Sequence, residues 1–120
     1  MIVRFVYGIF PAVIFFTDKL VRSGFKGTTR GAVIGIAPDK RSDQGLIEHE
    51  LTHVRQWYRT LGLHSFLYLF FGDYRLEAEV EAYRKQLKYN PDDAWTFAGF
   101  IATRYDLLIT QEDAYKLLTT

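Results

Sequence analysis

Residues 44–60 carry apolar side chains with the spacing of an amphipathic helix. These apolar positions are Leu46, Ile47, Leu51 and Val54. Positions three and four residues apart share one side of a helix, so we expect this side to be buried. Ser42 or Asp43 precedes the segment and is the residue type that caps a helix N-terminus. The pattern therefore predicts a helix over 44–60.

A second helix is predicted around residues 76–87, because residues 76–84 have high helix propensity. Its apolar stripe consists of Leu76, Val80, Tyr83 and Leu87. At about 100° per residue, Glu79 lies at the edge of this stripe and Glu77 somewhat further out. Glu81 lies well toward solvent on the same count. Glu79 is therefore the acid best placed to point inward, and Glu77 is second.

The remaining pattern predicts strands in the N-terminal third. The uncharged run 5–16, interrupted by Pro11, favours one or two buried strands or a strand followed by a helix. Glycines between residues 24 and 31 indicate turns, and the β-branched segment 32–37 predicts a strand.

Further helices are expected in the second half of the chain. The aromatic segment 58–71 is predicted to be mostly helical and buried, with a break at Gly72-Asp73. Capping residues predict helices over 90–105 and 110–118. We therefore expect a single α+β domain over 1–120, with a sheet of two or three strands packed on four or five helices.

Composition limits the classes of protein that fit. Of 120 residues, 48% are hydrophobic and 17% aromatic, which predicts a folded domain. The aromatic residues are many for this length, so some of them are expected on a surface that contacts a partner or a membrane. The net charge of +1 gives no argument for nucleic-acid binding. Cysteine is absent, which fits a reducing compartment. The run 5–16 is too short to span a bilayer and lacks a signal-peptide cleavage site, so we expect a cytoplasmic protein, with a peripheral membrane contact as the alternative.

The most specific chemistry lies in the string HELTH, from His49 to His53. Two histidines four residues apart lie one turn apart on the same helix face, so both imidazoles can reach one metal ion. Glu50 lies beside that site, where it can take a proton from an activated water. The competing interpretation is a surface helix with two solvated histidines.

A catalytic zinc site usually has three protein ligands. The class with a third histidine six residues after the second is excluded, because that position is Arg59. The remaining histidine, His64, is interpreted as a polar residue on a turn. The third ligand is therefore expected to be a glutamate of the 76–87 helix.

HELTH followed about 25 residues later by Glu-x-Glu-Ala resembles the gluzincin group of zinc metallopeptidases, and HELTH itself is similar to the metal helix of thermolysin-like enzymes. The resemblance implies that His49, His53 and Glu79 bind Zn²⁺ when the family's Glu-x-x-Ala-Asp pattern is matched at Ala82. Tyr83 then replaces the aspartate that supports a ligand histidine, although a phenol can still hydrogen-bond an imidazole or carboxylate. A register shifted by two makes Glu77 the ligand and Glu81 the supporting carboxylate, but loses the alanine match.

The resemblance also implies a function: a peptidase in which Glu50 activates a water bound at zinc to attack a peptide or protein substrate. It implies that the strand before the metal helix pairs with substrate, although an ordinary core strand is equally consistent. An oxyanion stabiliser would be one of Tyr74, Tyr105, Arg104 and His64. The alternative is a non-catalytic, zinc-stabilised binding or structural protein, within a larger assembly or peripheral at a membrane.

Overall fold

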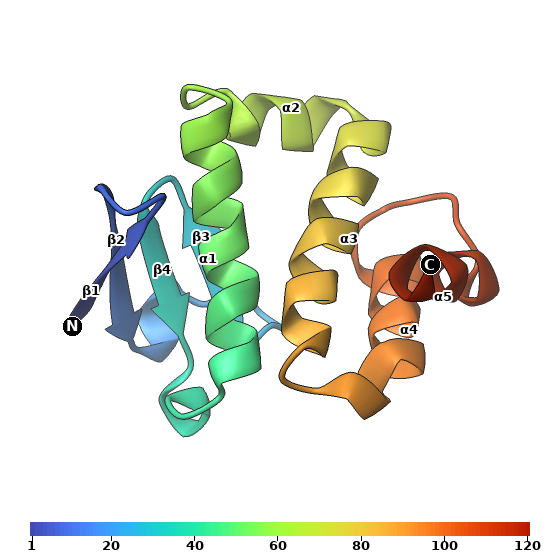
Figure 1. Cartoon of the computed structure of the whole chain (residues 1–120), viewed down its shortest axis with the longest axis horizontal. Helices are drawn as coiled ribbons and strands as arrows, with labels where there is room; N and C mark the ends of the chain where they lie inside the picture. The colour runs from blue at the N-terminus through green and yellow to red at the C-terminus, as the bar shows by residue number, and fades with distance from the viewer.

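The computed structural model describes residues 1–120 as one four-stranded sheet and five α-helices (Figure 1). The predicted α+β class is confirmed, with one strand more than expected. The strands are β1 (Ile2–Val6), β2 (Phe10–Phe16), β3 (Gly27–Arg30) and β4 (Val33–Ile36). The helices are α1 (Gln44–Arg59), α2 (His64–Phe70), α3 (Gly72–Leu87), α4 (Ala94–Arg104) and α5 (Gln111–Thr119). Short 3₁₀ turns occupy Asp18–Leu20, Pro38–Lys40 and Pro91–Asp93.

The sheet has the strand order β1-β2-β4-β3. The β1–β2 and β3–β4 pairs are antiparallel, whereas β2 and β4 are parallel with Ile14 opposite Ile34. The predicted strand over 32–37 is confirmed as β4, but it is paired on both sides and is therefore an interior strand. The predicted turns are confirmed at Gly24 and Gly31, but the prediction was wrong for Gly27–Arg30, which forms the edge strand β3.

Helix α1 packs across the sheet and closes the first hydrophobic core (Figure 1). This core comprises Val6, Ala12, Ile14, Ile34, Ile36, Ile47, Leu51 and Val54. The helix begins where the sequence predicts, because the Asp43 side chain accepts a hydrogen bond from the Leu46 backbone N–H at 3.0 Å. Burial of its apolar side fixes the rotation of α1, so its other side faces α3.

A second core joins α3, α4 and α5. It comprises Tyr83, Phe97, Ala98, Ile101, Ala114 and Leu118, with Leu76, Val80 and Leu87 packed against it. The predicted apolar stripe of α3 is thus confirmed. In Figure 1, α1 and α3 run side by side. The side chains of His49 and His53 on α1 and of Glu79 on α3 lie close together where these two helices meet.

Two predictions of burial were wrong. The aromatic segment after α1 forms the short helix α2, whose outer side is exposed: Phe66, Leu69 and Phe70 are each more than half exposed. The first strand is also largely exposed, with Phe5 61% accessible. None of the helices combines the length and the apolar character needed to cross a bilayer.

Candidate metal centre

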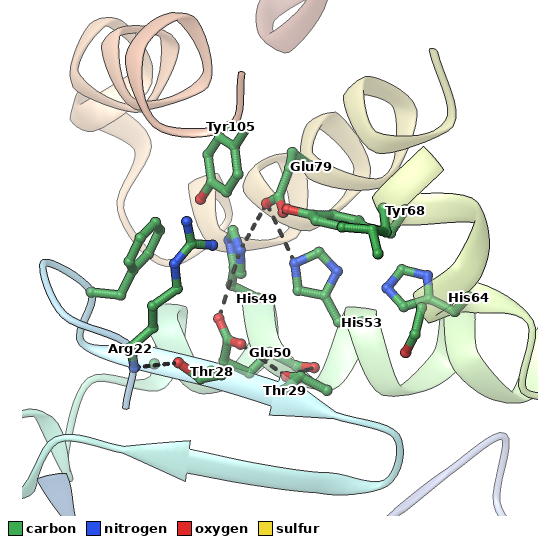
Figure 2. Close-up of a pocket in the computed structure, with 14 residues that line it drawn as sticks. Arg22, Thr28, Thr29, His49, Glu50, His53, His64, Tyr68, Glu79 and Tyr105 are labelled. Carbon is green, nitrogen blue, oxygen red and sulfur yellow. Dashed lines mark hydrogen bonds and ion pairs between the residues drawn. The ribbon is translucent and has the colours of Figure 1, made fainter. Parts of the chain in front are cut away.

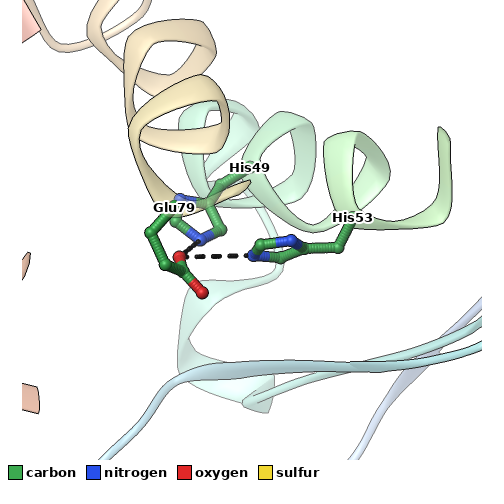
Figure 3. A group of neighbouring side chains, drawn as sticks. All are labelled: His49, His53 and Glu79. Atoms are coloured by element: carbon green, nitrogen blue, oxygen red, sulfur yellow. Dashed lines mark ion pairs between the residues drawn. The ribbon is translucent and has the colours of Figure 1, made fainter. Parts of the chain in front are cut away.

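Three buried side chains from α1 and α3 converge on one point (Figure 3). Nε2 of His49 and Nε2 of His53 each lie 3.3 Å from Oε1 of Glu79. All three donor atoms lie within 4.8 Å of one another. The structure therefore brings together His49, His53 and Glu79, and this group could bind a metal ion.

The two separations that involve Glu79 suit a four-coordinate cation. In a tetrahedral site with metal–ligand bonds of about 2.0–2.2 Å, neighbouring ligand atoms lie about 3.3–3.6 Å apart. The two distances of 3.3 Å to Glu79 agree with this spacing. Oε1 of Glu79 is also buried without a hydrogen-bond partner, an arrangement that is costly for a carboxylate oxygen unless a cation satisfies it.

The electrostatics of the group also favour a cation. Burial alone would lower the pKa of His53, but Glu79, with smaller contributions from Glu50 and Gln56, outweighs burial and raises that pKa to about 9. Burial alone would raise the pKa of Glu79, but the two histidines hold it well below its usual range. Glu79 is therefore a buried anion, with 2% of its surface exposed, aimed at two imidazole nitrogens.

A chain of side chains behind His53 fixes its orientation. Nδ1 of His53 lies 2.8 Å from Oε1 of Gln56, so the imidazole donates through Nδ1 and its Nε2 faces the group. The amide of Gln56 donates to the Ala78 carbonyl at 3.0 Å and to the Glu81 carboxylate at 2.9 Å. Arg59 closes the chain with an ion pair to Glu81 at 2.7 Å. Glu81 is thus partly buried, in contrast to its predicted place in solvent.

Glu79 and Glu77 have different environments, although both lie on α3. The Tyr68 hydroxyl donates a hydrogen bond to Oε2 of Glu79, which leaves Oε1 directed at the histidines. Burial, followed by the negative charge of Glu79, raises the pKa of Tyr68, so the phenol keeps its proton and remains a donor. Glu77 is exposed and lies outside the group.

Glu50 lies next to the three donors and is held by β3 (Figure 2). Its Oε2 is 3.7 Å from Nε2 of His49. Its Oε1 accepts a hydrogen bond from the Thr29 hydroxyl at 2.8 Å. Gly27 makes room for this side chain, because a Cβ at that position would lie 3.0 Å from Cγ of Glu50.

Tyr83 does not replace the family's supporting aspartate in the way the resemblance suggested. Its ring packs edge-on against His49, with centroids 4.4 Å apart, and its hydroxyl is paired with the Tyr105 hydroxyl at 2.7 Å. Nδ1 of His49 consequently has no hydrogen-bond partner within the chain.

The donors open into a cleft made of two adjoining cavities of about 360 and 410 Å³. Both cavities are lined by Phe25, Gly27, His49, Glu50 and Tyr105. The first also contains His64 and Tyr68, and the second contains Arg104. The interpretation of His64 as a turn residue was wrong: it begins α2 and its Nδ1 lies 2.7 Å from the Tyr74 hydroxyl.

Sequence reasoning missed several residues that shape this site. Gln56 lies three residues after His53, a spacing at which helix side chains meet, and this signal could have identified it. Thr29 and Gly27 belong to a strand that was interpreted as a turn. Tyr68 and Arg22 reach the cleft through tertiary packing, and no local pattern in the sequence marks them as residues of the site.

Comparison with known protein families gave no match, and no curated protein or solved structure was significantly similar to this chain. The fold and the site therefore define the molecule by themselves: an α+β domain with a buried His₂Glu group at the base of a cleft.

Proposed function

We propose that this chain is a zinc-dependent hydrolase, specifically a metallopeptidase that cleaves peptide bonds. The proposal is carried by the convergence of His49, His53 and Glu79 with the carboxylate of Glu50 beside them. Two imidazoles and one carboxylate, with a fourth position left for solvent, form a ligand set of catalytic zinc sites. The donors are buried, which suits metal ligands, and they line the wall of an open cleft. The cleft supports a site that a substrate can reach.

In this proposal His49, His53 and Glu79 hold the zinc ion. Zinc, when bound, lowers the pKa of water and polarises a carbonyl group. Glu50 acts as the general base: its Oε1 is occupied by Thr29, so Oε2, on the side of His49, accepts the proton of the attacking water. Glu50 then passes this proton to the nitrogen of the leaving amine.

The other cleft residues bind and orient the substrate. Of the four proposed oxyanion stabilisers, His64 and Tyr105 line the same cavity as His49, whereas Arg104 lines the adjoining one and the Tyr74 hydroxyl is bonded to His64. Burial lowers the pKa of His64 to about 4, so a neutral imidazole that accepts from Tyr74 would carry its proton on Nε2. Because β4 is paired on both sides, the free edge of β3 would be the one that pairs with an extended peptide.

A peptide-library assay tests this function. The zinc-loaded protein should cleave a subset of peptides, lose activity on treatment with a chelator, and regain it when zinc is restored. Stoichiometric zinc without cleavage of any peptide would favour the alternative, a zinc-stabilised binding or structural protein.

A further inference from the structure

An arginine that is not needed for metal binding reaches into the cleft. Arg22 lines the same cavity as His49, Glu50, His53 and Glu79. Figure 2 shows its guanidinium on the side of Tyr105 and His49, although Arg22 as a whole is exposed. Its side chain makes no ion pair and no hydrogen bond within the chain, although a guanidinium offers five donors.

The arrangement around Arg22 holds it in this place. The backbone N–H of Arg22 donates to the Thr28 hydroxyl at 3.0 Å, which ties the segment to β3. The guanidinium carbon lies 4.9 Å from the centre of the Phe25 ring, a cation–π contact that limits where the side chain can swing. An arginine positioned by its neighbours and left without an anionic partner is suited to bind one from outside the chain.

Arg22 is the only arginine or lysine that lines the first cavity. The acids of the first cavity are Glu50 and Glu79, which the proposed chemistry already uses. In the adjoining cavity, Lys40 and Arg104 also form no ion pair. Because the adjoining cavity also contains the acids Asp43 and Asp93, Arg22 is the clearest candidate to bind an anion near the donor group.

We infer that Arg22 determines specificity by binding a carboxylate of the peptide substrate close to the bond that is cleaved. This inference rests on the proposed peptidase function and names its substrate class: peptides that carry an acidic side chain or a free C-terminal carboxylate in the first cavity. The bidentate geometry of guanidinium and carboxylate distinguishes such a group from its neutral amide analogue.

The test uses the zinc-loaded protein with Glu50→Gln, which should bind peptides without cleaving them. Fluorescently labelled alanine-based hexapeptides would carry Glu or Gln at each position in turn, with either a free or an amidated C-terminus. The affinity for the preferred acidic peptide should exceed that for its Gln or amide analogue by about tenfold or more. The Glu/Gln pairs and the acid/amide pairs identify which carboxylate is bound.

Arg22→Gln added to this protein should abolish the preference while leaving the affinity for neutral peptides unchanged. Arg30→Gln is the matched control, because Arg30 is exposed, lies outside both cavities and makes no ion pair. The inference would be overturned by equal affinity for charged and neutral peptides, or by no binding of either. It would also be overturned by a preference that survives Arg22→Gln but not Arg104→Gln. The wild-type protein could instead prefer acidic peptides and cleave none of them. That result would contradict the peptidase function but would still support the binding of a carboxylate by Arg22.

Discussion

The side-chain oxygen of Gln56 lies 2.8 Å from Nδ1 of His53, one turn further along the same helix. This contact fixes the nitrogen through which His53 faces Glu79. It also connects the donor group to Glu81 and Arg59, which lie outside it.

Gln56→Leu should therefore weaken zinc binding by about tenfold to a hundredfold, the range found when a partner of a ligand histidine is lost. Competition with a chromogenic chelator measures this change. Gln44→Leu is the matched control, since Gln44 is exposed at the start of α1 and should leave the affinity unchanged. Unchanged affinity in Gln56→Leu would show that this contact does not support the metal.

The two candidate acids of α3 can be separated in the same assay. Glu79→Gln should reduce zinc affinity by more than about a hundredfold, because it removes a charged ligand rather than a partner of one. Glu77→Gln should have no effect, because Glu77 is exposed and lies outside the group. The reverse order would assign the ligand to Glu77 and restore the shifted register.

Glu50→Gln should keep zinc at wild-type stoichiometry while hydrolysis falls by about 10²–10⁴-fold, the usual contribution of a general base. Zinc content and hydrolysis of the same preparation would be measured together. Undiminished hydrolysis would remove Glu50 from the mechanism, and loss of zinc would show that it acts as a ligand instead.

Thr29→Val should lower kcat by about fivefold to tenfold without changing zinc affinity, because it removes one hydrogen bond to the Glu50 carboxylate. Thr29→Ser retains the hydroxyl and should restore the rate. Equal rates for the wild-type protein and both variants would exclude a positioning role for Thr29.

The fold itself can be tested by two leucine substitutions. Leu51→Ala should lower the free energy of unfolding by about 2–5 kcal/mol, because Leu51 is 1% exposed in the first core. Leu69→Ala should change it by less than about 0.5 kcal/mol, because Leu69 is 68% exposed on α2. Urea denaturation of both variants gives the comparison, and similar losses would mean that α2 is buried.

Much of this architecture could be predicted because its signals are local. The N-cap Asp43 and the apolar spacing of α1 gave the helix that carries both histidines. Periodicity on α3 placed Glu79 further inward than Glu77, and the structure has 2% of Glu79 exposed. In both cases one face of a helix is selected by burial, and burial follows sequence spacing.

The errors arose where tertiary packing decides. Strand β3 has the sequence Gly-Thr-Thr-Arg, without a large apolar residue, because it borders the cleft rather than a core. The aromatic residues of α2 match a buried helix in composition, yet nothing in their spacing shows that the chain leaves Phe70 uncovered. Glu81 was expected in solvent from the periodicity of its own helix. Its partners Arg59 and Gln56 belong to another helix, so this contact could not be predicted from the spacing on α3.

A crystal structure of the zinc-loaded protein, with anomalous data collected at the zinc edge, tests the central claim most directly. We predict one strong peak at about 2.0–2.2 Å from Nε2 of His49, Nε2 of His53 and Oε1 of Glu79. Zinc bound at other residues would contradict the account. So would a protein saturated with zinc in which these three atoms lie too far apart to bind the same ion.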